Sequence, residues 1–586
     1  MDRHVGKYAI LLLFIALPLT QIFASPYDSW SFKRTLLIEN PYGPLTDHQV
    51  LVEFDSSALI SRGEMRPDCG DLRFTDASDN PLSYWIESGC GTPTTRVWVR
   101  VPRIDPGYNV LRMYHGNPSA TSESDEVRTM DRAISVGGSG NDWLYDVTTD
   151  GTYIYAAGRI TSPSGDWDAV LIKLDPLLDT VREVVLRGSS WEELYGIYYD
   201  GSYIYAVGYS YSCPGTALIV KADTDLNVVS VRSASSGTLD YLYKVVGDGS
   251  HLYAVGYHAT SVRPTVYDGL LLRIDPDLTS FSGVGYGGSY NDGFQNLVLM
   301  GGKIYAVGIA NSPTSGRDQL GNPFWMYGDG LVARFDGLTF EKGLLIGGVG
   351  HEFIYSIDAL NDRLYAAGIT TSTGLGEMDV IVVELDGDLG VLKSGIVGGP
   401  LNESAGMIYA YGGHLYLTGY HGVDGDLNGF IAQLDPDLGL VKAKMYGGPN
   451  YDQFTEMMGL GDYLHVVGFT SSYGSGGWDG WVAQLYKELE YRSMTTGLEY
   501  GDAPLQAEDA SLPVSAPGLN HYTVAFTASD CSLSIQEGVT ERRAFLRKVP
   551  MLEAEFTGAV GGEIVAPTEG VWILLLLVPV LRRLSH

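Results

Sequence analysis

Hydrophobic and polar residues alternate along short stretches in the middle of the chain. The stretch DGTYIYAAG at 150–158 shows this alternation after an Asp-Gly turn. A period of two is typical of β-strands, whereas an amphipathic helix places apolar residues at i, i+3 and i+4. The same phrase occurs seven times, in copies that end at Gly158, Gly208, Gly256, Gly308, Gly368, Gly419 and Gly468. The pattern therefore predicts a β-rich repeat protein.

Each copy lies in a longer unit, with a spacing of about 50 residues. The units begin near Gly137, Gly188, Ser235, Gly287, Gly347, Gly398 and Gly447. The first unit predicts four short strands, which begin near Trp143, Tyr153, Asp168 and Arg182 and are separated by turn residues. Four antiparallel strands per unit are typical of one blade of a β-propeller.

The ends of the repeat region predict how a ring would close. The last unit ends after its third strand, DGWVAQLYKEL, while RAISVGG at 132–138 resembles the fourth strand of the other units. We therefore expect a seven-bladed β-propeller over residues 132–487, closed by a strand at 132–136, because this exchange removes an exposed sheet edge.

The units resemble the seven-bladed β-propeller repeat called SBBP, on the basis of their Gly-Gly start, the D-G-x-x-Y-x-x-G phrase and an Asp before the third strand. That carboxylate recurs as Asp168, Asp268, Asp329, Asp379 and Asp479. One interpretation is a set of calcium ligands, since oxygen donors suit this cation. The favoured interpretation is structural, with each carboxylate accepting hydrogen bonds in a turn, because a binding site usually breaks the symmetry of a ring.

A second all-β module precedes the ring. Residues 27–128 lack the repeat, and alternation in RVWVRVPRI and HQVLVEF predicts the strands of a β-sandwich. Its phrases DLRF, YWIE and LRMYHGNPS resemble domain of unknown function 2341, a module of prokaryotic surface proteins related to concanavalin-like jelly rolls. Relatives of that fold bind glycans, so the resemblance makes Tyr84, Trp85 and Trp98 candidates for stacking on sugars. Packing in the sandwich core is the favoured alternative for Trp85 and Trp98.

Four cysteines are present, without a Cys-x-x-Cys pair that would suggest zinc. Cys69 and Cys90 flank a predicted hairpin of the sandwich, and we expect a disulfide between them. Cys531 pairing with Cys213 would join the segment after the ring to the second blade, but the sequence does not decide this. Residues 488–566 show no repeat, and we expect a small β module or a stalk there.

The two ends predict export and attachment to the cell surface. Residues 1–24 combine basic residues, an apolar run and small residues, as in a secretory signal peptide. An apolar block at 571–583 ends with Arg582 and Arg583 and resembles a carboxy-terminal membrane anchor or a sorting tail of prokaryotic, and by expectation archaeal, surface proteins. The net charge of -32 argues against nucleic acid as a partner.

Few residues indicate catalysis. The sequence contains no Gly-x-Ser-x-Gly and no His-Glu-x-x-His motif. An insertion in the fourth unit carries Phe324 and Trp325, a candidate contact patch, and Asn402 begins an Asn-Glu-Ser glycosylation sequon. No cofactor is expected, apart from the calcium considered above.

These observations predict an exported, cell-surface-anchored, non-enzymatic binding or structural protein. Its β modules would present surfaces for a glycan or a cell-envelope protein. The alternative is a secreted carbohydrate-active enzyme, a glycoside hydrolase or lyase that uses carboxylates in the propeller channel. An inner strand with polar residues that the other blades lack would favour the alternative.

Overall fold

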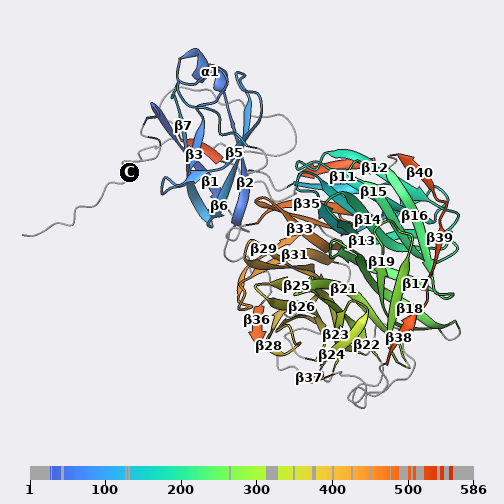
Figure 1. Ribbon diagram of the computed structural model, residues 1–586. Helices are drawn as coiled ribbons and strands as arrows, with labels where there is room; N and C mark the ends of the chain where they lie inside the picture. Colours follow the sequence, from blue (N-terminus) through green and yellow to red (C-terminus); the bar gives the residue numbers. More distant parts are fainter. Residues whose placement is uncertain are drawn as a thin grey trace, which may run out of the picture.

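The computed structural model describes residues 27–557, without residues 28, 41–44, 126–128, 130–131, 263–264, 289, 312–327, 348–349, 373–377, 399–400, 424–425, 448–449, 475–476, 488–498, 503–505, 510–519, 538–540 and 547–553. The described chain is almost entirely β-structure, as expected, and Figure 1 shows a small sandwich beside a large ring of sheets. The predicted signal peptide and hydrophobic tail lie outside the described residues. No helix among the described residues is long and apolar enough to cross a membrane.

The sandwich consists of two antiparallel sheets. One has the order β4-β3-β7-β1-β42 and the other β2-β6-β5. Their bounds are β1 Phe32–Asn40, β2 Leu45–Phe54, β3 Arg73–Thr75, β4 Pro81–Leu82, β5 Tyr84–Ser88, β6 Thr95–Ile104, β7 Gly107–His115 and β42 Ala554–Thr557, with the short helix α1 at Ser56–Ser61. Inward-facing residues such as Leu36, Val50 and Phe74 form its core and are almost completely buried.

The described residues after the sandwich form a β-propeller-like ring of successive four-stranded sheets, which we number sheet 1 to sheet 7. Sheets 1 to 3 hold β9 Trp143–Thr149, β10 Ile154–Thr161, β11 Trp167–Leu174 and β12 Thr180–Arg187; β13 Glu192–Tyr199, β14 Tyr203–Ser210, β15 Ala217–Asp223 and β16 Val228–Ser235; and β17 Asp240–Gly247, β18 Leu252–Val262, β19 Thr265–Ile274 and β20 Phe281–Gly287. Sheets 4 and 5 hold β21 Asp292–Met300, β22 Lys303–Ala310, β23 Asp329–Asp336 and β24 Thr339–Gly347; and β25 Glu352–Leu360, β26 Arg363–Thr370, β27 Asp379–Leu385 and β28 Val391–Gly398. Sheet 6 holds β29 Asn402–Tyr411, β30 His414–Val423, β31 Asp426–Leu434 and β32 Leu440–Tyr446, and sheet 7 holds β33 Asp452–Leu460, β34 Tyr463–Thr470, β35 Asp479–Tyr486 and the distant β8 Arg132–Gly137.

The sheets form a closed ring. The first strand of each sheet contacts the first strand of the next one, and β33 of sheet 7 contacts β9 of sheet 1. In sheet 7 the outer position belongs to β8, which pairs antiparallel with β35 over Arg132 to Val136. Because β8 comes from the amino-terminal side of the repeats, this pairing joins the two ends of the ring.

The tyrosine of the repeated phrase holds neighbouring sheets together. Tyr155, at the start of β10, donates its hydroxyl to the Thr224 carbonyl of sheet 2 at 2.8 Å, and Tyr205 donates to Pro276 of sheet 3 at 3.0 Å. Equivalent bonds link Tyr305 to Gly387, Tyr365 to Pro436 and Tyr416 to Lys487. These buried rings satisfy loop carbonyls of the next sheet, which explains why the phrase recurs.

Sheet 7 makes the equivalent link with different residues. His465 replaces the tyrosine and is almost completely buried, and this burial lowers the pKa of its imidazole to about 3. The link to sheet 1 comes from Gln484, whose amide donates to the Pro176 carbonyl at 2.6 Å. The hydrogen bond between sheets is therefore kept at the point where the ring closes.

The described strands between residues 499 and 546 lie along the rim of the ring, and we call them the belt. Its strands are β36 Glu499–Asp502, β37 Gln506–Asp509, β38 Asn520–Val524, β39 Thr527–Asp530, β40 Ser534–Glu537 and β41 Glu541–Leu546. In this order they pair with the outer strands of sheets 5, 4, 3, 2, 1 and 7, and the red strands along the rim in Figure 1 follow this path. The expectation of a separate β module or stalk for this region was wrong, because each strand completes a sheet of the ring.

The belt fits specific places on the rim. In β20, a Cβ atom at Gly283 would lie 2.5 Å from the Phe526 ring, and one at Gly285 would lie 2.3 Å from the Tyr522 ring. The two glycines thus leave the space that belt aromatics fill, as in aromatic rescue of glycines in sheets. A disulfide between Cys213 and Cys531 joins the belt to sheet 2, which settles the pairing that the sequence left open.

Candidate functional site: the aromatic end of the ring

A β-bulge recurs in the first strand of every sheet of the ring. The pairing of β9 with β10 skips Tyr145, and the matching irregularity skips Tyr195 in sheet 2 and Tyr243 in sheet 3. A bulge leaves one residue outside the regular ladder and redirects its side chain. In sheets 1 to 3 these rings contact one another in series, with centroids 4.6 Å apart for Tyr145 and Tyr195 and 4.8 Å apart for Tyr195 and Tyr243.

More aromatic side chains surround these tyrosines at the same end of the ring. We define the aromatic end as Trp143, Trp167, Trp191, Tyr211, Tyr241, Phe469 and Trp478, together with the three bulge tyrosines. Trp143 stacks on Phe469 at 4.8 Å, and Trp167 lies 5.0 Å from Trp191. Trp191 lies 6.1 Å from Tyr211, whose hydroxyl is 2.6 Å from that of Tyr241. The contacts form a row across sheets 7, 1, 2 and 3.

Arg159 holds the middle of this row in place. Its guanidinium lies 4.0 Å from the Trp143 ring centroid and 3.5 Å from that of Trp167, so it is stacked between two indoles. It also pairs with Glu193 at 2.9 Å, and both side chains are almost completely buried. Tyr145 and Tyr209 donate their hydroxyls to the same carboxylate, so the pair is joined to the aromatic network.

The outer members of the row are accessible to a ligand. Trp191 is 45% exposed and Tyr211 is 41% exposed. Trp143, Trp167, Tyr241 and Trp478 are half-buried. Contiguous exposed aromatic surface is uncommon on soluble proteins and marks interaction sites.

The row breaks the symmetry of the repeat. The position that Trp143 occupies in sheet 1, one residue before the strand pairs with the phrase glycine, is Glu193 in sheet 2 and Tyr241 in sheet 3. In sheets 4, 6 and 7 it is Gly293, Ser404 and Gln453, and in sheet 5 it is Phe353, which is almost completely buried. The sequence analysis did not predict this row, because its members differ between the units; an alignment of the seven units shows the variation.

The central channel contains a second asymmetric cluster. Directly after the bulge, sheets 1, 3 and 7 place Asp146, Lys244 and Glu456, and the Lys244 ammonium donates to Asp146 at 2.9 Å and to Glu456. Both carboxylates are almost completely buried. Burial raises the pKa of the Glu456 carboxyl to about 8, with Asp146 and Asp358 acting in the same direction and Lys244 opposing them. Burial lowers the pKa of Lys244, but its two carboxylate partners outweigh this and raise it overall.

The cluster links distant sheets across the channel. Asp146 also accepts the backbone N–H of Ile197 in sheet 2 at 2.8 Å, and Asp358 accepts that of Ala410 in sheet 6 at 2.7 Å. These carboxylates therefore satisfy inner strand edges that have no further strand beside them. Polar asymmetry of the inner strands, the feature named above as favouring an enzyme, is present.

The repeated aspartates before the third strand face structural partners. Asp168 is completely buried and accepts from Arg187 at 2.5 Å, and Asp268 accepts from the belt residue Tyr522 at 2.6 Å. A Cβ atom at Gly347 would lie 2.1 Å from Asp329, and one at Gly398 would lie 1.9 Å from Asp379. Asp479 is likewise buried in β35. Among the described residues no group of His, Cys, Asp and Glu side chains could hold a metal ion.

A different acidic residue caps the loop at the start of each sheet. Asp142 accepts the backbone N–H groups of Gly138 and Thr161, and Glu192 accepts that of Gly188. Asp240 accepts the N–H of Ser236 in the same way. These buried carboxylates hold the loops of the aromatic end in place, and the backbone N–H groups of the loops use their oxygen atoms as acceptors.

The other predicted site residues lie away from this end. Tyr84 is 1% exposed and belongs to the sandwich core, Trp98 is 6% exposed and packs with Leu51, and Trp85 is half-buried beside them. Their burial favours core packing over sugar stacking. Phe324 and Trp325 lie outside the described residues.

Two predictions concern covalent chemistry. The disulfide between Cys69 and Cys90 is present, as predicted, within the sandwich. Asn402 is the first residue of β29 and is half-buried.

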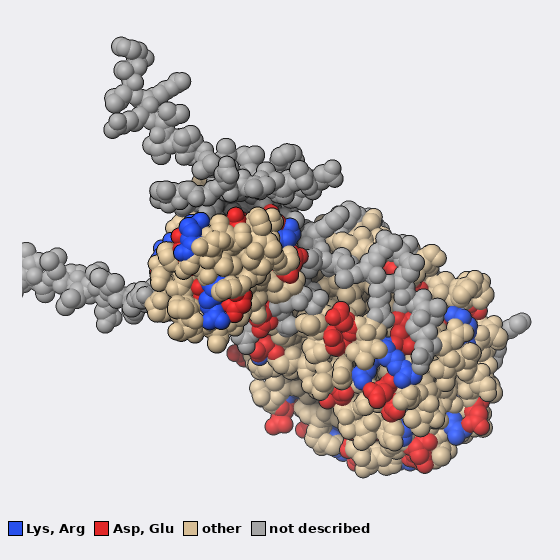
Figure 2. Space-filling model, turned by 90° about the horizontal axis from the view of Figure 1, so that it is seen from above, with Lys and Arg blue, Asp and Glu red and all other residues tan. Residues whose placement is uncertain are grey.

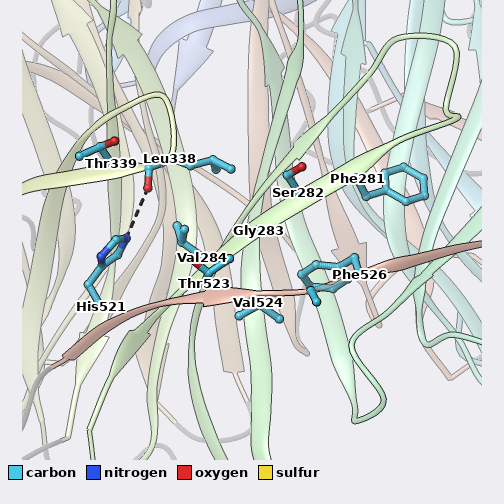
Figure 3. A pocket seen from close by; sticks show the side chains of 11 residues that line it. Phe281, Ser282, Gly283, Val284, Leu338, Thr339, His521, Thr523, Val524 and Phe526 are labelled. Carbon is cyan, nitrogen blue, oxygen red and sulfur yellow. Dashed lines mark hydrogen bonds between the residues drawn. The ribbon is translucent and has the colours of Figure 1, made fainter.

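A pocket of about 520 Å³ lies on the rim, between belt strand β38 and the edges of sheets 3 and 4. Figure 3 shows Phe281, Val284, Val524 and Phe526 around it, with His521 hydrogen-bonded to the Leu338 carbonyl. None of its lining residues is acidic or a nucleophilic cysteine. It lies where the belt meets the sheets.

One family model matches part of the chain. The family model described as "Domain of unknown function (DUF2341)" matches residues 68–135. No curated protein matches the chain.

Several solved structures are similar to the chain. One is a putative 6-phosphogluconolactonase from Bacteroides uniformis, with 13% identity over 65% of this chain and 99% of that chain and a TM-score of 0.35. The β-propeller domain of the Trilobed protease from Pyrococcus furiosus has 11% identity over 60% and 96% of the two chains, with a TM-score of 0.36. A Synechocystis apocarotenoid oxygenase mutant has 10% identity over 81% and 98%, with a TM-score of 0.29. Such distant similarities carry no argument about activity.

Proposed function

We propose that this protein is an exported, cell-surface-anchored binding protein that holds its ligand on the aromatic end of a seven-bladed propeller. The observation that carries the proposal is the exposed aromatic row over sheets 7, 1, 2 and 3. Sheet 5 also has aromatic residues at the equivalent positions, but its Phe353 is almost completely buried and stacks on Tyr355. Tyrosine and tryptophan supply large, rigid and amphipathic contact area, which suits binding.

Display outside the cell is supported by three features. The amino-terminal signal and the carboxy-terminal apolar tail predict export and attachment, and the two disulfides fit an oxidising environment. Disulfides and a belt also suit a scaffold that must persist outside the cell. In this proposal the sandwich is a second module beside the ring, and the ring carries the ligand.

The binding test uses the full mature chain on arrays of glycans and of cell-envelope proteins. The double variant W191A/Y211A removes the two most exposed rings of the row. The control is Tyr203→Ala, because Tyr203 is 36% exposed and lies at the opposite end of β14. We expect the double variant to lose the array signal and the control to keep it. Retention of every signal by the double variant would contradict the proposal.

The channel cluster favours a second candidate, a carbohydrate-active enzyme. Asp146 and Glu456 are two carboxylates in one buried site, and a pKa of about 8 would keep Glu456 protonated at neutral pH, as a general acid requires. Against this role, both carboxylates bind Lys244. Release of reducing sugar ends from polysaccharide by the wild type, abolished in Glu456→Gln, would establish the enzyme; no release supports the binding protein.

A further inference from the structure

The charges at the aromatic end limit the kind of ligand that it can hold. The whole chain carries a net charge of -32, and Figure 2 shows acidic side chains scattered over the visible face of the ring. At the aromatic end itself, Arg159 and Glu193 neutralise each other and are almost completely buried.

The remaining acids of the site are also occupied. Asp142, Glu192 and Asp240 are buried and accept backbone N–H groups. Asp166, at the tip of the loop before β11, accepts hydroxyl hydrogen bonds from Ser162 and Ser164. An anionic ligand is disfavoured because the protein is acidic and these residues include no free cation. A cationic ligand is disfavoured because the carboxylates are already hydrogen-bonded within the protein.

The shape of the row indicates a ligand with several similar units. Aromatic planes follow one another from Trp478 in sheet 7 through Trp143 and Trp167 in sheet 1, which Arg159 joins, to Trp191 in sheet 2, and Tyr241 continues the row in sheet 3. Phe469 and Arg159 both lie over the Trp143 ring, so the outer rings, Trp191 and Tyr211, provide most of the accessible aromatic surface. A single small ring would cover only one of these planes. The hydroxyls of Tyr211 and Tyr241 lie 2.6 Å apart at the exposed side and add polar contacts beside the apolar faces.

We propose that the ligand is an uncharged polysaccharide, which lies across sheets 7, 1, 2 and 3 and packs its sugar rings against the exposed parts of the aromatic row, centred on Trp191 and Tyr211. This inference rests on the proposed function and specifies its ligand. Sugar rings have apolar faces for stacking and hydroxyls at their edges, which matches a surface of indoles and phenols. Because no charge pairing contributes, binding is insensitive to ionic strength.

The experiment compares neutral and anionic polymers with the same backbone. The full mature chain runs in native gels that contain hydroxyethylcellulose, β-1,3-glucan, amylose or carboxymethylcellulose, at about 0.05 and 0.5 M NaCl. We expect at least one neutral polymer to retard the protein equally at both salt concentrations. W191A/Y211A weakens this retardation at least tenfold, and Tyr203→Ala leaves it unchanged.

The outcomes separate this inference from the proposed function. Retardation by carboxymethylcellulose alone, or retardation that salt abolishes, overturns the inference. Absence of retardation by all three neutral polymers also overturns it, while the proposed function stands if W191A/Y211A still removes a signal on the protein array. Retardation that the double variant does not weaken contradicts both.

Discussion

The two ends of sheets 1 to 3 carry aromatic residues of different kinds. At one end, nearly every sheet has a tyrosine at the position of Tyr155 and Tyr205. These two tyrosines are completely buried and donate hydrogen bonds to carbonyls of the next sheet. At the other end, Trp191 and Tyr211 have no regular counterparts and are 45% and 41% exposed. Aromatic residues that repeat hold the ring together, and those that break the repeat form the surface for a ligand.

Arg159 forms a buried ion pair and also contacts the aromatic row, so we expect its loss to lower the free energy of unfolding more than the other single substitutions below. Arg159→Leu leaves Glu193 buried without its cation, and we expect the free energy of unfolding to fall by about 3–5 kcal/mol. Denaturant unfolding measures the change. The double variant R159L/E193L removes both charges and should recover only part of the loss, because Tyr145 and Tyr209 lose the acceptor of their hydroxyls. A single variant as stable as the wild type would show that the pair does not support the aromatic end.

Trp191→Ala should separate binding from stability. Because the ring is almost half exposed, we expect at least a tenfold loss of ligand affinity, about 1.4 kcal/mol, with little change in the free energy of unfolding. Titration calorimetry and thermal unfolding measure the two quantities. Equal affinity in variant and wild type would remove Trp191 from the binding surface.

Tyr205→Phe should show the opposite behaviour. The ring still fills its buried site, but the hydrogen bond to the Pro276 carbonyl is lost. We expect a loss of about 1 kcal/mol in the free energy of unfolding and an unchanged ligand affinity. If the folded variant binds the ligand more weakly than the wild type, the repeated tyrosines affect ligand binding as well as stability.

Glu456 should affect a different property, the dependence of stability on pH. The folded protein keeps this carboxyl protonated up to a pKa of about 8, whereas the unfolded chain releases the proton above about 4.5. The folded state therefore binds more protons in this window, so stability falls as pH rises through it. Glu456→Gln should flatten this component of the slope, as followed by unfolding at pH 5, 7 and 8.5. If the stability of variant and wild type changed equally with pH, Glu456 would not be the group that holds the proton in this window.

Repetition explains which parts of the structure could be predicted. The strands of sheets 1 to 7 follow from local alternation and turns, and the phrase tyrosines were visible because they recur. The aromatic row was missed because Trp143, Trp191 and Lys244 are departures from the repeat, and their convergence depends on the bulges and on the closure of the ring.

The belt could not be predicted for a different reason. Its strands pair with sheets far away in the sequence, from Glu499 opposite Gly398 to Cys531 bonded to Cys213 across 318 positions. No local pattern encodes such partners. The rings of Tyr522 and Phe526 pack over glycines of another strand, and this contact forms only when the chain folds. In the sandwich, alternation indicated the strands but did not separate core aromatics such as Tyr84 from surface ones.

The most direct test of the account measures stability and ligand affinity together for W191A and Y205F. The account predicts that W191A loses affinity at least tenfold and keeps the wild-type melting temperature, while Y205F melts earlier and keeps wild-type affinity. If both variants lose affinity and stability in the same proportion, the distinction between repeated structural aromatics and unrepeated binding aromatics is contradicted.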